Sequence, residues 1–231
     1  MLKNTIAIAA FLAQLSIAGF AQEALPTELV LTTRSELERS YLPHDMNLKS
    51  GPLAEAYDLF LLAARRPGGA VFTHGCEAPA QTLVSMPSTY SLANALDLLT
   101  AIYTTHNWAV RDGVIDLLPK ENLPAILNAP IERFAWDTNE TPGRSVGRLF
   151  DLSNVERRLI ELGIGRELVT LGLQQAPRVF GAPQAPTGRE WKVENVTLLT
   201  ALNRIVASYG NARWVYEERN CGTKISRVWA H

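Results

Sequence analysis

One 22-residue segment occurs twice in this chain, and the repeat constrains its fold more than any other feature. Residues 90–111 align without a gap on residues 196–217, at a constant offset of 106 positions. Six positions are identical and pair Leu92 with Leu198, Ala95 with Ala201, Leu96 with Leu202, Ala101 with Ala207, Tyr103 with Tyr209 and Trp108 with Trp214. Because these residue types fill cores, the repeat predicts two copies of one folding unit and gives no hint of catalysis.

Each copy predicts a helix followed by a β-hairpin. Ser91 and Thr197 occupy equivalent positions, where a hydroxyl oxygen can accept a hydrogen bond from the first helical turn. Apolar residues then recur every three or four positions, which gives each helix one apolar face. In the first copy Asp112-Gly113 favours a type I′ turn, because both central residues of that turn need positive φ. We expect the repeated core to contain Leu92, Leu96, Tyr103, Trp108, Leu198, Leu202, Tyr209 and Trp214.

A fainter third copy extends the first unit toward the N-terminus. Residues 53–59 resemble residues 92–98 at an offset of 39 positions. Residues 53–118 therefore predict the order helix, strand, strand, helix, strand, strand, with residues 81–86 as the second strand. The predicted fold class is α+β, with two small modules in which helices pack on short mixed sheets.

The first unit resembles a known family of envelope domains. The residues concerned are Gly-Pro-Leu-Ala-Glu-Ala-Tyr-Asp-Leu at 51–59, Ser-Leu-Ala-Asn-Ala-Leu-Asp-Leu-Leu at 91–99 and Trp-Ala-Val-Arg-Asp-Gly-Val-Ile-Asp-Leu at 108–117. They are similar to the helix and the Asp-Gly hairpin of the secretin and TonB short N-terminal (STN) domain. The resemblance covers residues 46–119 and, more distantly, 189–229. It implies domains that bind other proteins and have no active site, here as two divergent copies in a stand-alone exported protein.

Proline and glycine divide the chain, because they cluster at residues 119–130 and again at 177–188. We expect an extension over 22–45, a first module over 46–119, a linker over 120–130 and a second module over 131–231 with an insertion at about 138–188. Within the second module, residues 131–136 predict a strand and residues 153–162 predict a helix.

The first 21 residues have the layout of a cleavable secretory signal. Lys3 is the single early cation, an apolar stretch runs over residues 6–17, and the small residues Gly19 and Ala21 precede Gln22. The alternative is a membrane anchor, but this apolar stretch is short and interrupted, whereas a spanning helix needs about 20 residues. We therefore expect a periplasmic or secreted protein that begins near Gln22 and has no transmembrane segment.

Charge and strand content indicate the kind of partner. Without the signal the chain has 21 basic and 23 acidic side chains, so it offers no electrostatic argument for binding nucleic acid. Exposed strand edges, by contrast, can extend their hydrogen bonding to another chain. We expect the partner to be an envelope protein or a second copy of this chain.

The chain has two cysteines, Cys76 and Cys221. An even count in an exported protein favours a disulfide between them. The alternative makes Cys76 reactive, because His74 and Glu77 set an imidazole and a carboxylate beside the thiol. That alternative predicts a secreted thiol- or metal-dependent enzyme centred on His74, Cys76 and Glu77.

Other catalytic patterns are missing from the sequence. It contains no Gly-x-Ser-x-Gly, His-Glu-x-x-His or Cys-x-x-Cys motif, and its four histidines are isolated. Asp112 and Asp116 flank the hairpin turn, and we expect them at the turn and on its solvent face. We therefore predict a non-catalytic protein without catalytic, cofactor-binding or metal-binding residues, which acts through protein–protein interaction or assembly.

Overall fold

The computed structural model describes residues 32–51, 53–76, 82–167 and 189–231. The expected signal sequence and Glu77 lie outside this range. The first half of the chain contains α1 (Arg34–Arg39), β1 (Met46–Gly51), α2 (Leu53–Ala64), β2 (Gly68–His74), β3 (Thr82–Met86), α3 (Leu92–Ile102), β4 (His106–Arg111) and β5 (Val114–Pro119). The second half contains the short 3₁₀ helix η1 (Ala125–Asn128), β6 (Pro130–Asp137), α4 (Pro142–Phe150), α5 (Ser153–Glu161), β7 (Ile164–Arg166), β8 (Glu190–Thr197), α6 (Leu198–Tyr209), β9 (Arg213–Asn220) and β10 (Lys224–Ala230).

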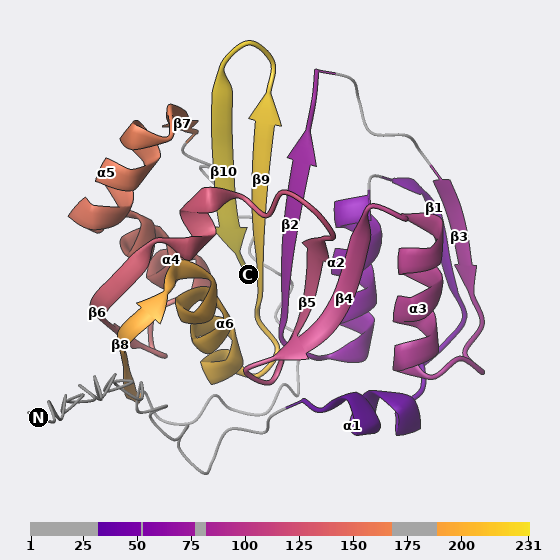
Figure 1. Ribbon diagram of the computed structural model, residues 1–231. Helices are drawn as coiled ribbons and strands as arrows, with labels where there is room; N and C mark the ends of the chain where they lie inside the picture. Colours follow the sequence, from indigo (N-terminus) through magenta and orange to yellow (C-terminus); the bar gives the residue numbers. More distant parts are fainter. Residues whose placement is uncertain (1–31, 52, 77–81, 168–188) are drawn as a thin grey trace, which may run out of the picture.

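The fold is mixed α+β, as the sequence predicts. A six-stranded sheet has the order β4-β5-β2-β9-β10-β7, and two small sheets consist of β1 with β3 and β6 with β8 (Figure 1). The predicted strand at residues 131–136 is β6, and the predicted helix at residues 153–162 is α5.

Apart from the additional helix α5, the two halves have the same order of helices and strands and the same strand pairings. In the first half β1 pairs with β3 and β4 pairs with β5, both antiparallel, and β2 runs parallel to β5. In the second half β6 pairs with β8 and β9 pairs with β10, again antiparallel, and β7 runs parallel to β10. By this order β4 corresponds to β9, and β2 corresponds to β7.

Local features form at the predicted positions. The Ser91 hydroxyl accepts a hydrogen bond from the Asn94 amide at 3.2 Å, and the Thr197 hydroxyl accepts one from the Thr200 amide at 3.2 Å. Between β4 and β5, Asp112 and Gly113 have φ values of 52° and 76°, the positive values that a type I′ turn needs. Helix starts and the first hairpin are thus encoded locally.

One junction joins the halves into a single sheet. β2 runs parallel to β9 over seven register pairs, from Gly68 with Arg213 to His74 with Arg219. The modules therefore share a sheet, which the sequence pattern did not indicate. The segment expected as a linker contributes Ile126 and Leu127, both fully buried. The described part of the segment expected as an insertion, residues 138–167, forms α4, α5 and β7, which hold the places of a helix and a strand of the first half.

The six-stranded sheet separates two hydrophobic cores. Ala70 and Phe72 of β2 belong to the first core and Val71 to the second, because side chains alternate along a strand. β9 alternates in the same way, with Val215 in the first core and Trp214 in the second. Helices α2 and α3 therefore pack on one face of the sheet, while α4 and α6 pack on the other.

The repeated residues differ in burial. Leu92, Leu96, Leu198, Leu202 and Trp214 are at most 2% exposed, and Trp108 is 9% exposed. Tyr103 and Tyr209 are only partly buried, because each lies at the end of its helix, where the ring reaches the margin of the core. The Tyr209 hydroxyl is 3.0 Å from the Glu140 carbonyl oxygen, to which it donates.

Gly69 lets β2 approach the indole of Trp214. A Cβ atom at Gly69 would lie 2.3 Å from the indole ring. We therefore expect Gly69→Ala to lower the free energy of unfolding by about 1–3 kcal/mol, the usual cost of overpacking. Gly147→Ala on α4 is the matched control, since its Cβ would meet no atom within 4 Å and alanine favours a helix. Equal denaturation midpoints for the two variants would contradict the packing argument.

Candidate functional site

The ends of β2, β9 and β10 form a ridge that extends beyond the helices (Figure 1). We define the ridge as residues 73–76 and 217–225. Most of these residues are exposed, including the whole turn from Arg219 to Ile225. The ridge is thus a polar extension of the junction between the halves.

Both cysteines lie on the ridge. The last register pair of the junction is His74 with Arg219, and Cys76 and Cys221 each follow two residues later. The Sγ atom of Cys76 lies 3.9 Å from the carbonyl oxygen of Asn220, and contact with Cys76 raises the pKa of the Cys221 thiol. Both thiols are exposed and free in this structure. Two residues that are 145 positions apart in the sequence are therefore neighbours.

His74 does not form the thiol–imidazole pair of the enzyme hypothesis. Its ring stacks on Phe72 with the centroids 6.3 Å apart, and its Nε2 atom lies 3.6 Å from Oε1 of Glu217. Glu217 also lies 3.7 Å from the guanidinium of Arg219. The imidazole is therefore directed to a carboxylate on β9, while the Cys76 thiol contacts Cys221.

Charged groups line the face of the ridge beside β10. Arg227 donates to both carboxylate oxygens of Glu167, at 2.6 and 2.9 Å. These hydrogen bonds lower the pKa of Glu167 and raise that of Arg227. With Glu217, Arg219 and Ile225, the pair lines a small pocket. The charged side chains of this pocket already form ion pairs within the chain, so the pocket is an ordered part of the polar surface.

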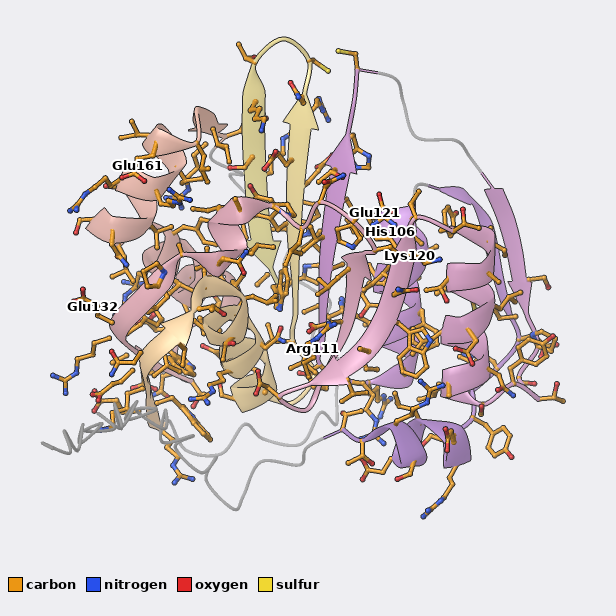
Figure 2. All side chains as sticks on the ribbon, in the orientation of Figure 1. His106, Arg111, Lys120, Glu121, Glu132 and Glu161 are labelled. Carbon is orange, nitrogen blue, oxygen red and sulfur yellow. The ribbon has the colours of Figure 1, made fainter. Side chains whose placement is uncertain are left out.

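Strand β4 forms one outer edge of the six-stranded sheet among the described residues. His106 is the first residue of β4, and its Nε2 atom donates a hydrogen bond to the Val71 carbonyl oxygen at 3.0 Å, which holds the start of the strand in place. Burial lowers the pKa of this ring. Figure 2 shows His106 and Arg111 at opposite ends of β4. Asn107 and Arg111 are exposed, whereas Trp108 is packed over the first core. The edge is thus anchored and accessible from outside.

Asp116 on β5 is fully buried, which corrects the expectation that it lies on the solvent face. Its Oδ2 atom accepts a hydrogen bond from Asn203 Nδ2 at 2.9 Å and lies 3.4 Å from Arg111, while Oδ1 has no partner. Burial raises the pKa of Asp116 to about 7, although Asn203 and Arg111 act against the rise. The apolar residues on both sides of Asp116, Val114-Ile115 and Leu117-Leu118, are the sequence signal for a strand buried on both faces.

A chain of side-chain hydrogen bonds then links the halves. Asn203 on α6 accepts a hydrogen bond from the Trp214 indole at 2.8 Å while it donates to Asp116. A second link joins α2 to β9, where Arg213 donates to Asp58 at 2.6 Å. Burial raises the pKa of Asp58, but the hydrogen bond from His231 and the Arg213 charge outweigh it and lower the pKa overall. These buried polar contacts hold the junction together and are not arranged around an open cleft.

The described part of the chain holds no group of three or more His, Cys, Asp or Glu side chains that could bind a metal ion. None of its helices has both the length and the apolar character needed to cross a membrane. Comparison with protein-family models, with curated proteins and with solved structures finds no match to this chain.

Proposed function

We propose that this chain is an exported, non-catalytic envelope protein whose two halves are divergent copies of an STN-like module, and that it binds a protein partner through the edge of β4. The N-terminal layout of residues 1–21 supports export. The common order of elements, the common pairings and the 22-residue repeat support the two copies.

One observation carries the binding proposal: the two halves already associate edge to edge. The junction uses the outer edge of β2 and the outer edge of β9, over seven register pairs. β4 corresponds to β9 in the order of elements, and no strand among the described residues pairs with the outer edge of β4. The first half therefore offers the same kind of edge that the second half uses at the junction. A free edge presents backbone amides and carbonyls to which another strand can add.

β4 is the longer of the two outer strands of this sheet. It has six residues, from His106 to Arg111, whereas β7 at the other end has three. The Asn107 and Arg111 side chains of β4 are exposed, and β4 stands at one end of the sheet order of the described residues. An extended segment of another envelope protein, or of a second copy, would continue the sheet there.

The enzyme alternative has less support. Its thiol contacts Cys221, its imidazole contacts Glu217, and its carboxylate Glu77 lies outside the described residues. The contacts of His74 and Cys76 therefore favour a structural role for both side chains.

Site-specific photo-crosslinking tests the proposed edge. A photoreactive amino acid at Asn107 on β4 should capture a protein partner in intact cells, because the incoming strand would lie within reach of that side chain. The control places the same amino acid at Glu161 on α5, which Figure 2 shows on the opposite side of the molecule. Glu161 is exposed and forms a surface ion pair with Arg158, so its replacement should leave the fold intact.

The mass of the crosslinked product identifies the partner. A product of twice the monomer mass would indicate self-association, and any other defined mass would indicate a different envelope protein. Equal capture at residues 107 and 161, or capture at neither, would contradict the β4 proposal.

A further inference from the structure

We propose that Cys76 and Cys221 form an intramolecular disulfide on the ridge that staples β2 to β9 and so closes the junction between the two halves. This inference goes beyond the proposed function, because it concerns how the halves are held together. It rests on the register of the junction and is independent of which partner binds β4.

The register brings the two residues close together. The last register pair of β2 and β9 is His74 with Arg219, and Cys76 and Cys221 each lie two residues beyond it, just past the ends of the strands. The same parallel register, continued for two residues, would set the cysteines side by side. Neighbouring strands lie about 4.8 Å apart, and disulfides join Cα atoms about 4.4–6.8 Å apart. The Cys76 thiol already contacts the backbone at Asn220. Bridging therefore needs little movement of either strand.

Exposure and proximity make the two thiols accessible to an oxidant and to each other. Both are exposed, so a small oxidant can reach them. Contact with the Cys76 thiol raises the pKa of the Cys221 thiol, and the Arg219 guanidinium acts in the opposite direction. A thiolate is the attacking species in disulfide exchange, and an adjacent second thiol resolves the mixed disulfide that results.

The chemistry balances with a low-molecular-weight disulfide as the oxidant. The thiolate of one cysteine attacks oxidised glutathione, forms a mixed disulfide and releases one glutathione thiolate. The second cysteine then loses its proton, attacks the mixed disulfide and releases the second glutathione. The two protein thiols lose two electrons and two protons in total, and glutathione gains them.

The bridge would constrain a long segment of the unfolded chain. It would close a loop between two cysteines that are 145 positions apart, and this loop runs from β3 of the first half to β9 of the second. Long enclosed loops lose the most conformational entropy on crosslinking, so the oxidised protein should be more resistant to unfolding than the reduced one.

Oxidation of the purified, reduced protein tests the proposal. After incubation with oxidised glutathione, the intact mass should fall by that of two hydrogen atoms. Proteolysis without reductant should then yield one crosslinked peptide that contains both cysteines. Neither thiol should react with iodoacetamide under denaturing conditions until reductant is added, and the thermal midpoint should rise on oxidation.

Single-cysteine variants are the matched controls. Cys76→Ser and Cys221→Ser should each gain one glutathione adduct and show no rise in thermal midpoint, because the resolving thiol is gone. A wild-type protein that carries two glutathione adducts, keeps two alkylatable thiols or forms a disulfide-linked dimer would overturn the proposal.

The outcome is separable from that of the crosslinking experiment. The oxidation uses purified protein and needs neither export nor a partner. The Cys76→Ser/Cys221→Ser variant should keep its crosslink from residue 107, because β4 lies at the other end of the sheet order from the second half. If the double variant lost that crosslink, the disulfide would also affect partner binding at β4, which would contradict the proposal that it acts only at the junction.

Discussion

Replacing Trp214 with alanine is expected to lower the free energy of unfolding by about 3–5 kcal/mol, the usual range for truncating a buried tryptophan. The Trp214 side chain is fully buried in the second core and packs against Gly69 of β2. Its indole N–H donates to Asn203 at 2.8 Å, so the variant also leaves a buried amide oxygen without that donor. Denaturant unfolding monitored by circular dichroism measures the loss.

Two further variants divide this effect into its causes. Trp214→Phe keeps most of the ring volume and removes the N–H group, so it should cost less than the alanine variant. Trp108→Ala removes the repeat equivalent, which is 9% exposed and donates to Asp97 at 2.7 Å. We expect its cost at the lower end of the range, near about 3 kcal/mol. An unchanged midpoint for Trp214→Ala, together with loss of the crosslink from residue 107, would make Trp214 a binding residue instead.

The second large effect is a dependence of stability on pH that arises from Asp116. Burial raises the pKa of Asp116 from 3.8 to about 7, so the folded protein keeps this proton after the unfolded chain has lost it. Between about pH 4 and pH 7 the folded state binds more protons, and stability should therefore fall as pH rises. A difference of about three pKa units corresponds to about 4 kcal/mol across that range.

Asp116→Asn should remove this contribution, because asparagine does not ionise and can still accept the hydrogen bond from Asn203. The variant should gain stability relative to the wild type at pH 8 and lose that advantage near pH 4. Asp112→Asn is the control on the same hairpin, since asparagine tolerates the positive φ at that turn position and the buried carboxyl remains. Urea unfolding at a series of pH values gives both slopes, and a constant difference between wild type and Asp116→Asn would refute the buried acid.

The indole hydrogen bonds of the two halves provide a structural parallel to the sequence repeat. Trp108 donates to Asp97 on α3, and Trp214 donates to Asn203 on α6. Both acceptors lie 11 residues before their tryptophan, and they are related by the same offset of 106 positions. The acceptor is a carboxylate in the first half and an amide in the second, where the tryptophan is fully buried. An amide avoids the cost of a buried charge and can also donate to Asp116.

The sequence alone was sufficient for features that depend on neighbouring residues. Ser91 and Thr197 cap their helices, and Asp112-Gly113 makes the hairpin turn, because these choices depend on residues within one or two turns of the chain. The α+β class and the order of elements over residues 53–118 followed from apolar spacing for the same reason.

Only the tertiary structure decided the contacts between distant segments. The pairing of β2 with β9, the burial of Asp116 beneath α6 and the meeting of Cys76 with Cys221 all join residues of one half to residues of the other. An alternating or apolar sequence pattern predicts that a strand is buried, but it does not predict which strand pairs with it. Strand partners are selected by how whole surfaces fit, here by a glycine that admits an indole and by two cores packed on opposite faces of one sheet.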